Sequence, residues 1–275
     1  MRQITVAEGV RAMSLARYLS RAFPMCPGHI LRNAIRRRDV RVNGVRCGED
    51  AVVSGGDQLA VYIDDRFLTA PAKVLYEDGE ILALEKPQGL PVDVDADGIG
   101  EDTLLSRARA LYPAAELCHR LDAGTGGVTL LALTDEAHVS LISTFKNHLI
   151  EKTYRCLVVG CPAKPEGELV HYLRKDADAA LVKETGPNHP GAMRAALKYR
   201  VIERRGEVSL VEIDLGTGRT HQIRAQMAFI GCPVVGDDKY GDRAANKRLR
   251  APFPALWCVR LRLPDGRVFE SEAAF

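Results

Sequence analysis

Residues 119–127 combine chemically capable side chains with a turn that could present them. They read H-R-L-D-A-G-T-G-G and run directly into the apolar stretch 128–133. Loops held by a rigid element often carry binding and catalytic groups, so this segment is a candidate site. Residue types alone leave the role of Asp122 open, because an aspartate before a Gly-rich turn is more often a turn former than a nucleophile.

Other common chemistries find little support in the sequence. None of the seven cysteines forms a C-x-x-C pair, and His119 and His221 lack the spaced partners of a metal site. Residues 98–100 lack the third glycine of a dinucleotide-binding fingerprint, and no G-K-[ST] occurs. We therefore predict no disulfide framework, no metal and no cofactor.

The composition is typical of a soluble globular protein. The chain has 275 residues, of which 46% are hydrophobic and 27% charged, enough for a small domain and a larger one. No apolar run approaches the roughly 18 residues that span a bilayer. Residues 1–8 lack the apolar core of a signal peptide. These features predict a cytoplasmic protein without a membrane partner.

Positive charge is concentrated near the N-terminus. Residues 1–66 contain 11 Arg and no Lys against 7 Asp and Glu, whereas the whole chain has a net charge of only +2. A contact with a polyanion and a solvated basic face explain this excess equally well.

Two short helices are predicted over residues 14–23 and about 27–38, because apolar residues recur at helical spacing in both. Pro24 ends the first helix. Arg32 and Arg36 are four residues apart and share one face of the second.

A β-hairpin is predicted at residues 40–47, where Asn43-Gly44 stands between alternating residues and both turn positions need a positive φ. After a Gly-Gly-Asp turn, residues 59–63 alternate as a half-buried strand. This order of elements resembles the S4 RNA-binding domain over roughly residues 12–63. The resemblance implies that the second helix and the loop after it lie on structured RNA, and a purely structural cap is the alternative. Phosphate contacts would come from Arg32, Arg36, Arg37, Arg38 and Arg41.

The rest of the chain predicts a larger domain. Residues 64–72 are first charged and then read T-A-P-A, as in a linker. Strand-length apolar runs, such as 128–133, mix with a few helices from residue 73 to 275, which indicates an α+β domain around a mixed sheet. Residues 163–192 are rich in Gly, Pro and Lys and predict flexible loops. We thus predict an S4-like domain over 1–63, a linker over 64–72 and a catalytic domain over 73–275.

Five blocks, in the right order, resemble the pseudouridine synthase family that includes the large-subunit ribosomal RNA enzymes. The segment at 119–127 is similar to that family's H-R-L-D-x-x-T-S-G. The other blocks are E-K-P-Q-G-L at 85–90, K-T-Y at 152–154, G-R-T-H-Q-I-R at 218–224 and P-V-V-G-D-D-K-Y-G at 233–241. The resemblance implies an α+β pseudouridine synthase fold with a central mixed, mainly antiparallel sheet. It also implies isomerisation of uridine in RNA: the C1′–N1 bond breaks, the base rotates, and C5 joins the sugar without a cofactor.

The resemblance assigns roles to three residues. Asp122 corresponds to the catalytic aspartate, which either attacks the sugar or removes a proton to begin glycosidic cleavage. Arg224 corresponds to its partner, and a guanidinium suits this because it stays charged and binds carboxylate through two donors. Tyr154 corresponds to the active-site tyrosine, whose ring can stack on uracil and whose hydroxyl can assist proton removal at C5.

RNA access is expected to involve further residues. A uridine inside folded RNA must be extruded to reach Asp122, at a cost on the order of a few kcal/mol. Arg120 corresponds to the family arginine that fills the vacated space, and His119 would help to shape that wedge. Contacts to the RNA backbone or support of the loops would come from Lys86, Lys152 and Arg219.

The sequence departs from the family pattern at three places. Gly126 stands where serine is usual, which predicts a more mobile loop. Residues 256–258 read L-W-C where L-H-A is common, and Gln226 occupies a position often held by histidine. None of these is one of the three proposed catalytic residues, but they leave the substrate open.

Large-subunit ribosomal RNA is the favoured substrate because this domain pairing is common in such enzymes, and transfer RNA is the runner-up. A non-catalytic ribosome-assembly factor is a second hypothesis, against which the retained Asp122, Tyr154 and Arg224 argue. An unrelated hydrolase using Asp122 is a third, but no second spaced acid and no G-x-S-x-G support it. We expect a monomer.

Overall fold

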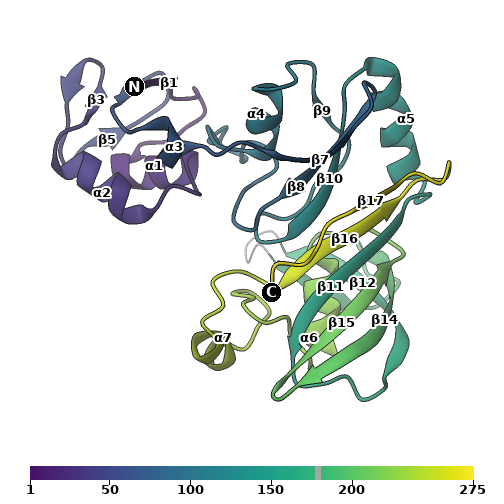
Figure 1. The fold of residues 1–275 in the computed structure, drawn as a ribbon. Helices are drawn as coiled ribbons and strands as arrows, with labels where there is room; N and C mark the ends of the chain where they lie inside the picture. Colours follow the sequence, from purple (N-terminus) through teal and green to yellow (C-terminus); the bar gives the residue numbers. More distant parts are fainter. Residues whose placement is uncertain (177–180) are drawn as a thin grey trace. The chain divides into compact units, whose positions relative to one another are not determined.

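A computed structural model describes residues 1–176 and 181–275, which form two compact units (Figure 1). Unit 1 comprises residues 1–73 and 89–116, and unit 2 comprises residues 74–88 and 117–275. Residues 89–116 therefore cluster with the N-terminal part of the chain, although they lie inside the predicted catalytic range. The predicted domain limits stay a prediction, and a short helix, α3 (Asp65–Leu68), lies inside the stretch expected to be a linker.

Two helices and small sheets surround the core of unit 1. The first helix begins where the side chain of Ser14 accepts a hydrogen bond from the backbone N–H of Arg17. Both predicted helices are confirmed, and the second ends at Arg36, two residues earlier than expected. The elements are α1 (Leu15–Ala22), α2 (Gly28–Arg36), a sheet of β1 (Arg2–Thr5), β6 (Gln58–Val61), β3 (Val40–Val42) and β4 (Val45–Arg46) in that order, and the pair β2 (Met13–Ser14) and β5 (Val52–Val53).

The predicted hairpin at residues 40–47 is confirmed. Strands β3 and β4 pair antiparallel around Asn43 and Gly44, whose φ angles are 51° and 82°. Because both turn residues have left-handed backbones, the Asn-Gly pair is what lets the chain reverse here.

Residues 89–116 are held to the N-terminal residues by buried contacts. The backbone N–H of Asp102 donates to the carbonyl of Ala22 at 2.8 Å, and Ile99 belongs to the core of unit 1. Asp102 also binds Arg107, which lies on α4 (Leu104–Arg109). Arg21 on α1 contacts two carboxylates of this segment, Asp95 and Asp97, each at 2.6 Å.

Unit 2 is built on one large sheet, and the predicted fold class is confirmed. Neighbouring strands β10 and β16 are parallel, whereas pairs such as β8–β10 and β14–β15 are antiparallel. Along the sheet the strands are β13 (Leu181–Thr185), β12 (Glu166–Asp176), β14 (Met193–Arg205), β15 (Val208–Leu215), β11 (Glu151–Val159), β16 (Leu256–Arg262), β10 (Gly126–Ala132), β8 (Ile81–Lys86) and β7 (Lys73–Glu77), with β17 (Val268–Glu270) beside β16 and β9 (Glu116–Leu117) beside β10. The helices are α5 (Asp135–Lys146), α6 (Gln222–Phe229) and α7 (Arg243–Leu249) (Figure 1).

Residues 163–192, which were predicted to contain flexible loops, consist mainly of two strands. Strands β12 and β13 pair antiparallel there, from Tyr172 opposite Thr185 to Asp176 opposite Leu181. Residues 177–180 lie outside the described residues. A Gly- and Pro-rich composition marks the ends of this segment, while the strands between them are held by their neighbours in the sheet.

Candidate active site

Asp122 lies on a tight turn between β9 and β10. The backbone N–H of Thr125 donates to the carbonyl of Asp122 at 2.9 Å and closes the turn. Gly127 then has a φ of 112°, and a Cβ on it would lie 2.2 Å from the carbonyl oxygen of Cys258. Glycine is therefore required here, because the start of β10 approaches β16 too closely for a side chain.

Lys86, at the end of β8, supports the turn that carries Asp122. Its buried Nζ donates to the carbonyls of Ala123 at 2.9 Å and Pro87 at 3.0 Å. Burial lowers the pKa of Lys86 to about 7, although the charge of Asp122 opposes this. Of the two roles predicted for Lys86, this geometry favours support of the loop over contact with RNA.

Arg224, on α6, faces Asp122. Its Nη1 lies 3.5 Å from Oδ2 of Asp122. Its Nε and Nη2 bind the two carboxylate oxygens of the fully buried Asp237, at 2.6 and 2.8 Å. Burial alone would lower the pKa of Arg224, but the hydrogen bonds and charge of Asp237 raise it above its usual value. A permanently charged guanidinium is thus fixed with one donor toward Asp122.

Asp237 is in turn held as a carboxylate. Burial alone would raise its pKa, but hydrogen bonds from Arg224 and from the backbone N–H groups of Lys239 and Tyr240 lower it. The pair of Arg224 and Asp237 is therefore ionised and rigid.

Tyr154 lies on β11, beside an irregularity in the pairing of β11 with β16 between Thr153 and Tyr154. The ring is buried, and it lies near the thiol of Cys258 on the neighbouring strand β16. Burial raises the pKa of Tyr154 well above its usual value, and nearby Cys258 and Asp122 add to this. The hydroxyl therefore keeps its proton at neutral pH.

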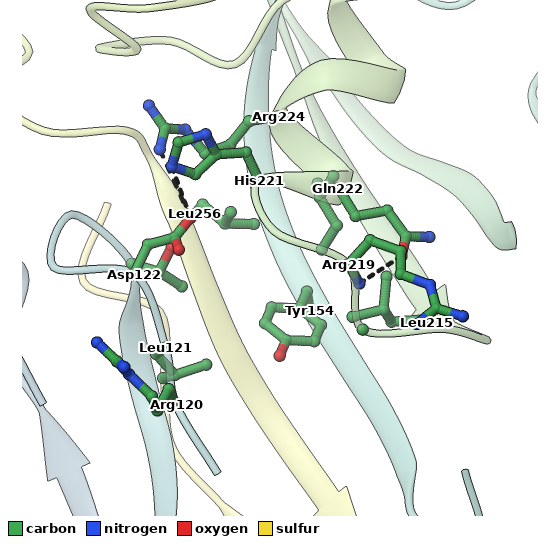
Figure 2. A pocket seen from close by; sticks show the side chains of 13 residues that line it. Arg120, Leu121, Asp122, Tyr154, Leu215, Arg219, His221, Gln222, Arg224 and Leu256 are labelled. Carbon is green, nitrogen blue, oxygen red and sulfur yellow. Dashed lines mark hydrogen bonds and ion pairs between the residues drawn. The ribbon is translucent and has the colours of Figure 1, made fainter. Parts of the chain in front are cut away.

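One pocket brings the three predicted catalytic residues together. It is lined by Asp122, Tyr154 and Arg224, with Arg120 and Arg219 at the same pocket. In Figure 2 the carboxylate of Asp122 points toward Arg224 and His221, and the hydroxyl of Tyr154 points away from them. Such a site can place a carboxylate beside a bound group while a cation balances its charge.

His119 and Lys152, which were predicted to contact RNA, form contacts within unit 2. Nε2 of His119 accepts a hydrogen bond from the backbone N–H of Leu130 at 2.9 Å, and the ring stacks on Phe145 at 4.3 Å between centroids. Burial lowers the pKa of His119 to about 3, helped by Lys152. Lys152 itself donates to the carbonyl of Ile150 at 3.1 Å. This geometry favours supporting roles, and the predicted RNA contacts stay predictions.

The residues that the sequence reasoning missed are Asp237, His221 and Tyr240. Nε2 of His221 lies 3.9 Å from Oδ2 of Asp122, and its Nδ1 lies 3.0 Å from the hydroxyl of Tyr240. All three lie within two of the blocks that resemble the family, at 218–224 and 233–241, so the motifs already included them. Only the folded backbone shows that these blocks meet at Asp122.

Gly126 and Trp257, two departures from the family pattern, are sterically linked. Gly126 is not part of a mobile loop but a buried residue of β10, so the predicted mobility was wrong. It pairs with Trp257 of β16, and a Cβ on Gly126 would lie 2.2 Å from atoms of the Trp257 ring. A serine at 126 is therefore incompatible with the tryptophan in its present position.

Within residues 1–176 and 181–275, no cluster of three or more His, Cys, Asp or Glu side chains is arranged to hold a metal ion. In the same part of the chain, no helix is both long enough and apolar enough to span a membrane.

The mixed sheet carries a pocket lined by an aspartate, an arginine and a tyrosine, the residue types that the resemblance to RNA pseudouridine synthases predicted. The RNA pseudouridylate synthase family model matches residues 80–229, and the chain belongs to this family. The ribosomal large subunit pseudouridine synthase C of Rickettsia bellii (strain RML369-C) is 30% identical over 262 residues, which cover 87% of this chain and 86% of the relative. The ribosomal large subunit pseudouridine synthase D of Pasteurella multocida (strain Pm70) is 31% identical over 263 residues, which cover 88% and 79%.

Solved structures show the same fold. The human RNA pseudouridylate synthase domain containing 1 superposes with a TM-score of 0.62 at 27% sequence identity, over 73% of this chain and 82% of that chain. The predicted enzyme class, RNA pseudouridine synthase, is thereby confirmed.

Proposed function

We propose that this pseudouridine synthase isomerises uridines in large-subunit ribosomal RNA, with Asp122 as its catalytic carboxylate. The observation that carries the site assignment is the 3.5 Å contact between Nη1 of Arg224 and Oδ2 of Asp122 in the pocket that Tyr154 lines. The substrate rests on the names of the relatives, which include ribosomal large subunit pseudouridine synthases C and D. Transfer RNA is the second candidate substrate.

The reaction needs a carboxylate beside the ribose and a site that receives negative charge on the base. Asp122 attacks C1′ or removes a sugar proton, and the electrons of the C1′–N1 bond leave with the uracil. After rotation, C5 bonds to C1′ as the Asp122–C1′ bond breaks or as the sugar proton is returned; the proton on C5 is then lost, and N1 gains a proton. Because Tyr154 keeps its own proton, it serves as a stacking surface and hydrogen-bond donor to the base.

Arg120 and Arg219 suit the entry of an extruded nucleotide. Arg120 is exposed at the pocket, whereas Arg219 is half-buried and its Nε donates to the carbonyl of Arg194 at 3.2 Å. An exposed guanidinium can stack on bases or fill the gap that a flipped nucleotide leaves. We assign the filling of this gap to Arg120.

Unit 1 is proposed to bind structured RNA in the manner of an S4 domain. The support is the confirmed order of helix, helix, hairpin and strand, together with four exposed arginines on and after α2: Arg32, Arg36, Arg37 and Arg38. Arg41 is half-buried over the ring of Tyr62. Arg36 forms an ion pair with Glu49 at 3.4 Å, which joins two exposed side chains and is readily exchanged for phosphate. A monomeric state and a cytoplasmic location also remain proposals from the sequence.

Mapping pseudouridine in RNA from cells with and without the gene tests the function. Carbodiimide-induced primer stops locate each modified uridine, and wild type and Asp122→Asn are restored separately. We expect stops in large-subunit ribosomal RNA that return with wild type and stay absent with Asp122→Asn. Stops that disappear only from transfer RNA would support the second substrate, and an unchanged map with an inactive purified protein would overturn the proposal in favour of a non-catalytic assembly factor.

A further inference from the structure

His221 precedes α6 with a left-handed backbone, with φ 51° and ψ 21°. The two nitrogens of its ring have different partners. Nδ1 lies 3.0 Å from the hydroxyl of Tyr240, and Nε2 lies 3.9 Å from Oδ2 of Asp122. The side chain thus connects the catalytic carboxylate with a tyrosine outside the pocket lining.

The hydrogen bonds of Tyr240 fit one tautomer of the His221 ring. The backbone N–H of Val182, on β13, donates to the hydroxyl oxygen of Tyr240 at 2.7 Å. The hydroxyl keeps its own proton for donation, and Nδ1 of His221 lies 3.0 Å away. A neutral imidazole whose Nδ1 is an acceptor carries its proton on Nε2. In that tautomer, His221 presents an N–H toward Asp122.

The charged groups around His221 agree with a neutral ring. Burial lowers the pKa of His221, and the cations Arg224 and Lys239 lower it further, while the carboxylates Asp122 and Asp237 raise it. The lowering dominates, so the ring is neutral at pH 7 and carries a single proton, which the Nε2–H tautomer places toward Asp122.

Both nitrogen donors meet the same oxygen of the catalytic carboxylate. Nη1 of Arg224 at 3.5 Å and Nε2 of His221 at 3.9 Å are each measured to Oδ2 of Asp122 (Figure 2). Arg224 and Asp122 form an ion pair, whereas the neutral ring of His221 lies beyond hydrogen-bond distance of Oδ2. Hydrogen bonds in catalytic sites often tighten only in the complex with substrate, and two donors on Oδ2 would then fix the rotation of the carboxylate and leave Oδ1 for the sugar.

The backbone that carries His221 is itself anchored. Oε1 of the buried Gln222 accepts hydrogen bonds from the hydroxyl of Thr217 at 2.7 Å and the backbone N–H of Arg219 at 3.0 Å. Its Nε2 donates to the carbonyl of Ala196 at 3.1 Å. A left-handed histidine persists only where the surroundings hold it, and Gln222 supplies that restraint.

We infer that His221 is a positioning residue: as its Nε2–H tautomer, set by the chain from the Val182 backbone through Tyr240, it holds Oδ2 of Asp122 and turns Oδ1 toward the substrate. The inference rests on the proposed catalytic role of Asp122. It predicts that the chemical step depends on the N–H of His221 while RNA binding does not.

Two replacements of His221 separate its two nitrogens. Asparagine places a polar atom near Nδ1, tolerates a left-handed backbone, and removes the donor to Asp122. Glutamine reaches the position of Nε2 and restores that donor. With excess enzyme and a transcript of large-subunit ribosomal RNA, we expect His221→Asn to lower the maximal single-turnover rate by about 10- to 100-fold, with unchanged half-saturation. His221→Gln should recover most of the lost rate.

A third variant leaves the backbone at residue 221 untouched. Tyr240→Phe removes the hydroxyl that selects the tautomer, and we expect a smaller fall in the maximal rate, again without a change in half-saturation. His148 is a matched control, because it is an exposed histidine with a φ of 57° that does not line the pocket. His148→Asn should react like wild type.

The outcomes distinguish this inference from the proposed function. Wild-type protein that forms no pseudouridine overturns the proposed function. If wild type is active and His221→Asn and Tyr240→Phe are equally active, the positioning role alone is overturned. The same holds if His221→Gln is folded, as judged by its thermal midpoint, yet reacts as slowly as His221→Asn. If glutamine lowers the thermal midpoint, Tyr240→Phe decides: a full rate overturns the inference, and a reduced rate with wild-type binding supports it.

Discussion

Each unit buries an arginine–aspartate pair of the same geometry. In unit 1, Nε and Nη2 of Arg107 bind the two oxygens of Asp102 at 2.6 and 2.8 Å. In unit 2, the same atoms of Arg224 bind Asp237 at 2.6 and 2.8 Å. In both pairs the arginine side chain is 6% exposed and the aspartate side chain 0%.

The pairs differ in what surrounds them. Asp102 also donates its backbone N–H to Ala22, so the first pair joins residues 89–116 to α1. Arg224 instead directs its remaining terminal nitrogen, Nη1, toward Asp122 in the pocket. A bidentate partner fixes the plane of a guanidinium, and what that plane faces then decides whether the pair supports the fold or also the chemistry.

The largest difference between the two pairs is expected at Asp122, the carboxylate that only the Arg224–Asp237 pair faces. Asp122→Asn keeps the shape of the side chain but removes the charge, so we expect pseudouridine formation to fall by at least about 10²- to 10⁴-fold. Asp122 is one-third exposed and its contacts are long, so the free energy of unfolding should change little. Single-turnover assays and urea unfolding measure the two quantities. An active Asp122→Asn enzyme would refute the site assignment.

Breaking each pair in the same way tests how far they are alike. Asp102→Asn and Asp237→Asn each leave a buried guanidinium without its carboxylate, and each should lower the free energy of unfolding by about 3–5 kcal/mol. Only Asp237→Asn should also slow the reaction in protein that is still folded, because Arg224 is then free to turn away from Asp122. Urea unfolding and rates at low temperature separate the effects. Equal rates for both variants would show that the orientation of Arg224 does not depend on Asp237.

A packing pair at β10 and β16 offers an independent comparison. Gly126→Ser would force the new side chain against Trp257, and we expect a loss of about 1–3 kcal/mol in unfolding free energy. Trp257→His, the residue common in the family, opens that space, so the double variant should be more stable than the sum of the single changes predicts. A double-mutant cycle in urea measures this coupling. Strict additivity would mean that Gly126 and Trp257 are unrelated departures.

The sequence predicted the local structure well where a residue pattern has a direct physical cause. Asn43-Gly44 requires positive φ angles, and the helices of unit 1 follow their apolar spacing. It did not reveal the two strands within residues 163–192, because the composition signals turns whereas long-range pairing in the sheet fixes β12 and β13. A similar long-range effect placed residues 89–116 with unit 1.

The three proposed catalytic residues were predicted from recognised motifs, whereas the contacts of Asp237 and Tyr240 behind them were not. Asp122, Tyr154 and Arg224 are far apart in the chain, and the fold brings them to one pocket. The contacts of Asp237 with Arg224, and of Tyr240 with His221, depend on how the segment 233–241 returns to α6. No spacing in the sequence specifies such a return, because loop conformation is set by tertiary contacts.

His119, the first residue of the H-R-L-D block, makes a pH-dependent contribution to the stability of the fold. The pKa of His119 falls to about 3 in the folded protein, from its ordinary value of 6.5. As the pH falls, His119 is therefore protonated in the unfolded chain before it is protonated in the folded protein. Stability from this group is complete above pH 6.5 and is lost as the pH falls toward 3, by about 1.4 kcal/mol per pH unit. Between pH 6.5 and 5 the loss is about 2 kcal/mol.

His119→Gln keeps an acceptor for the N–H of Leu130 but cannot be protonated. The variant should therefore lose less stability than wild type over this pH range, as urea unfolding at pH 6.5 and 5 would show. Other acidic and basic groups contribute equally to both proteins. The same pH slope in both would mean that His119 is not buried as a neutral ring.

The smallest effect is expected from the arginines of unit 1, and it sharpens the division of labour between the units. Each phosphate contact steepens the dependence of binding on salt, so Arg32→Ala with Arg36→Ala should reduce the slope of log K against log salt by up to about 2. The saturated single-turnover rate should be unchanged, because Asp122 and its partners lie in unit 2. Arg204→Ala with Arg205→Ala, which removes two exposed arginines at the end of β14, controls for net charge. If the Arg204/Arg205 variant lowers the salt slope as much as the Arg32/Arg36 variant does, unit 1 binds RNA no more specifically than any basic surface. If the saturated rate falls in the Arg32/Arg36 variant, α2 takes part in more than binding.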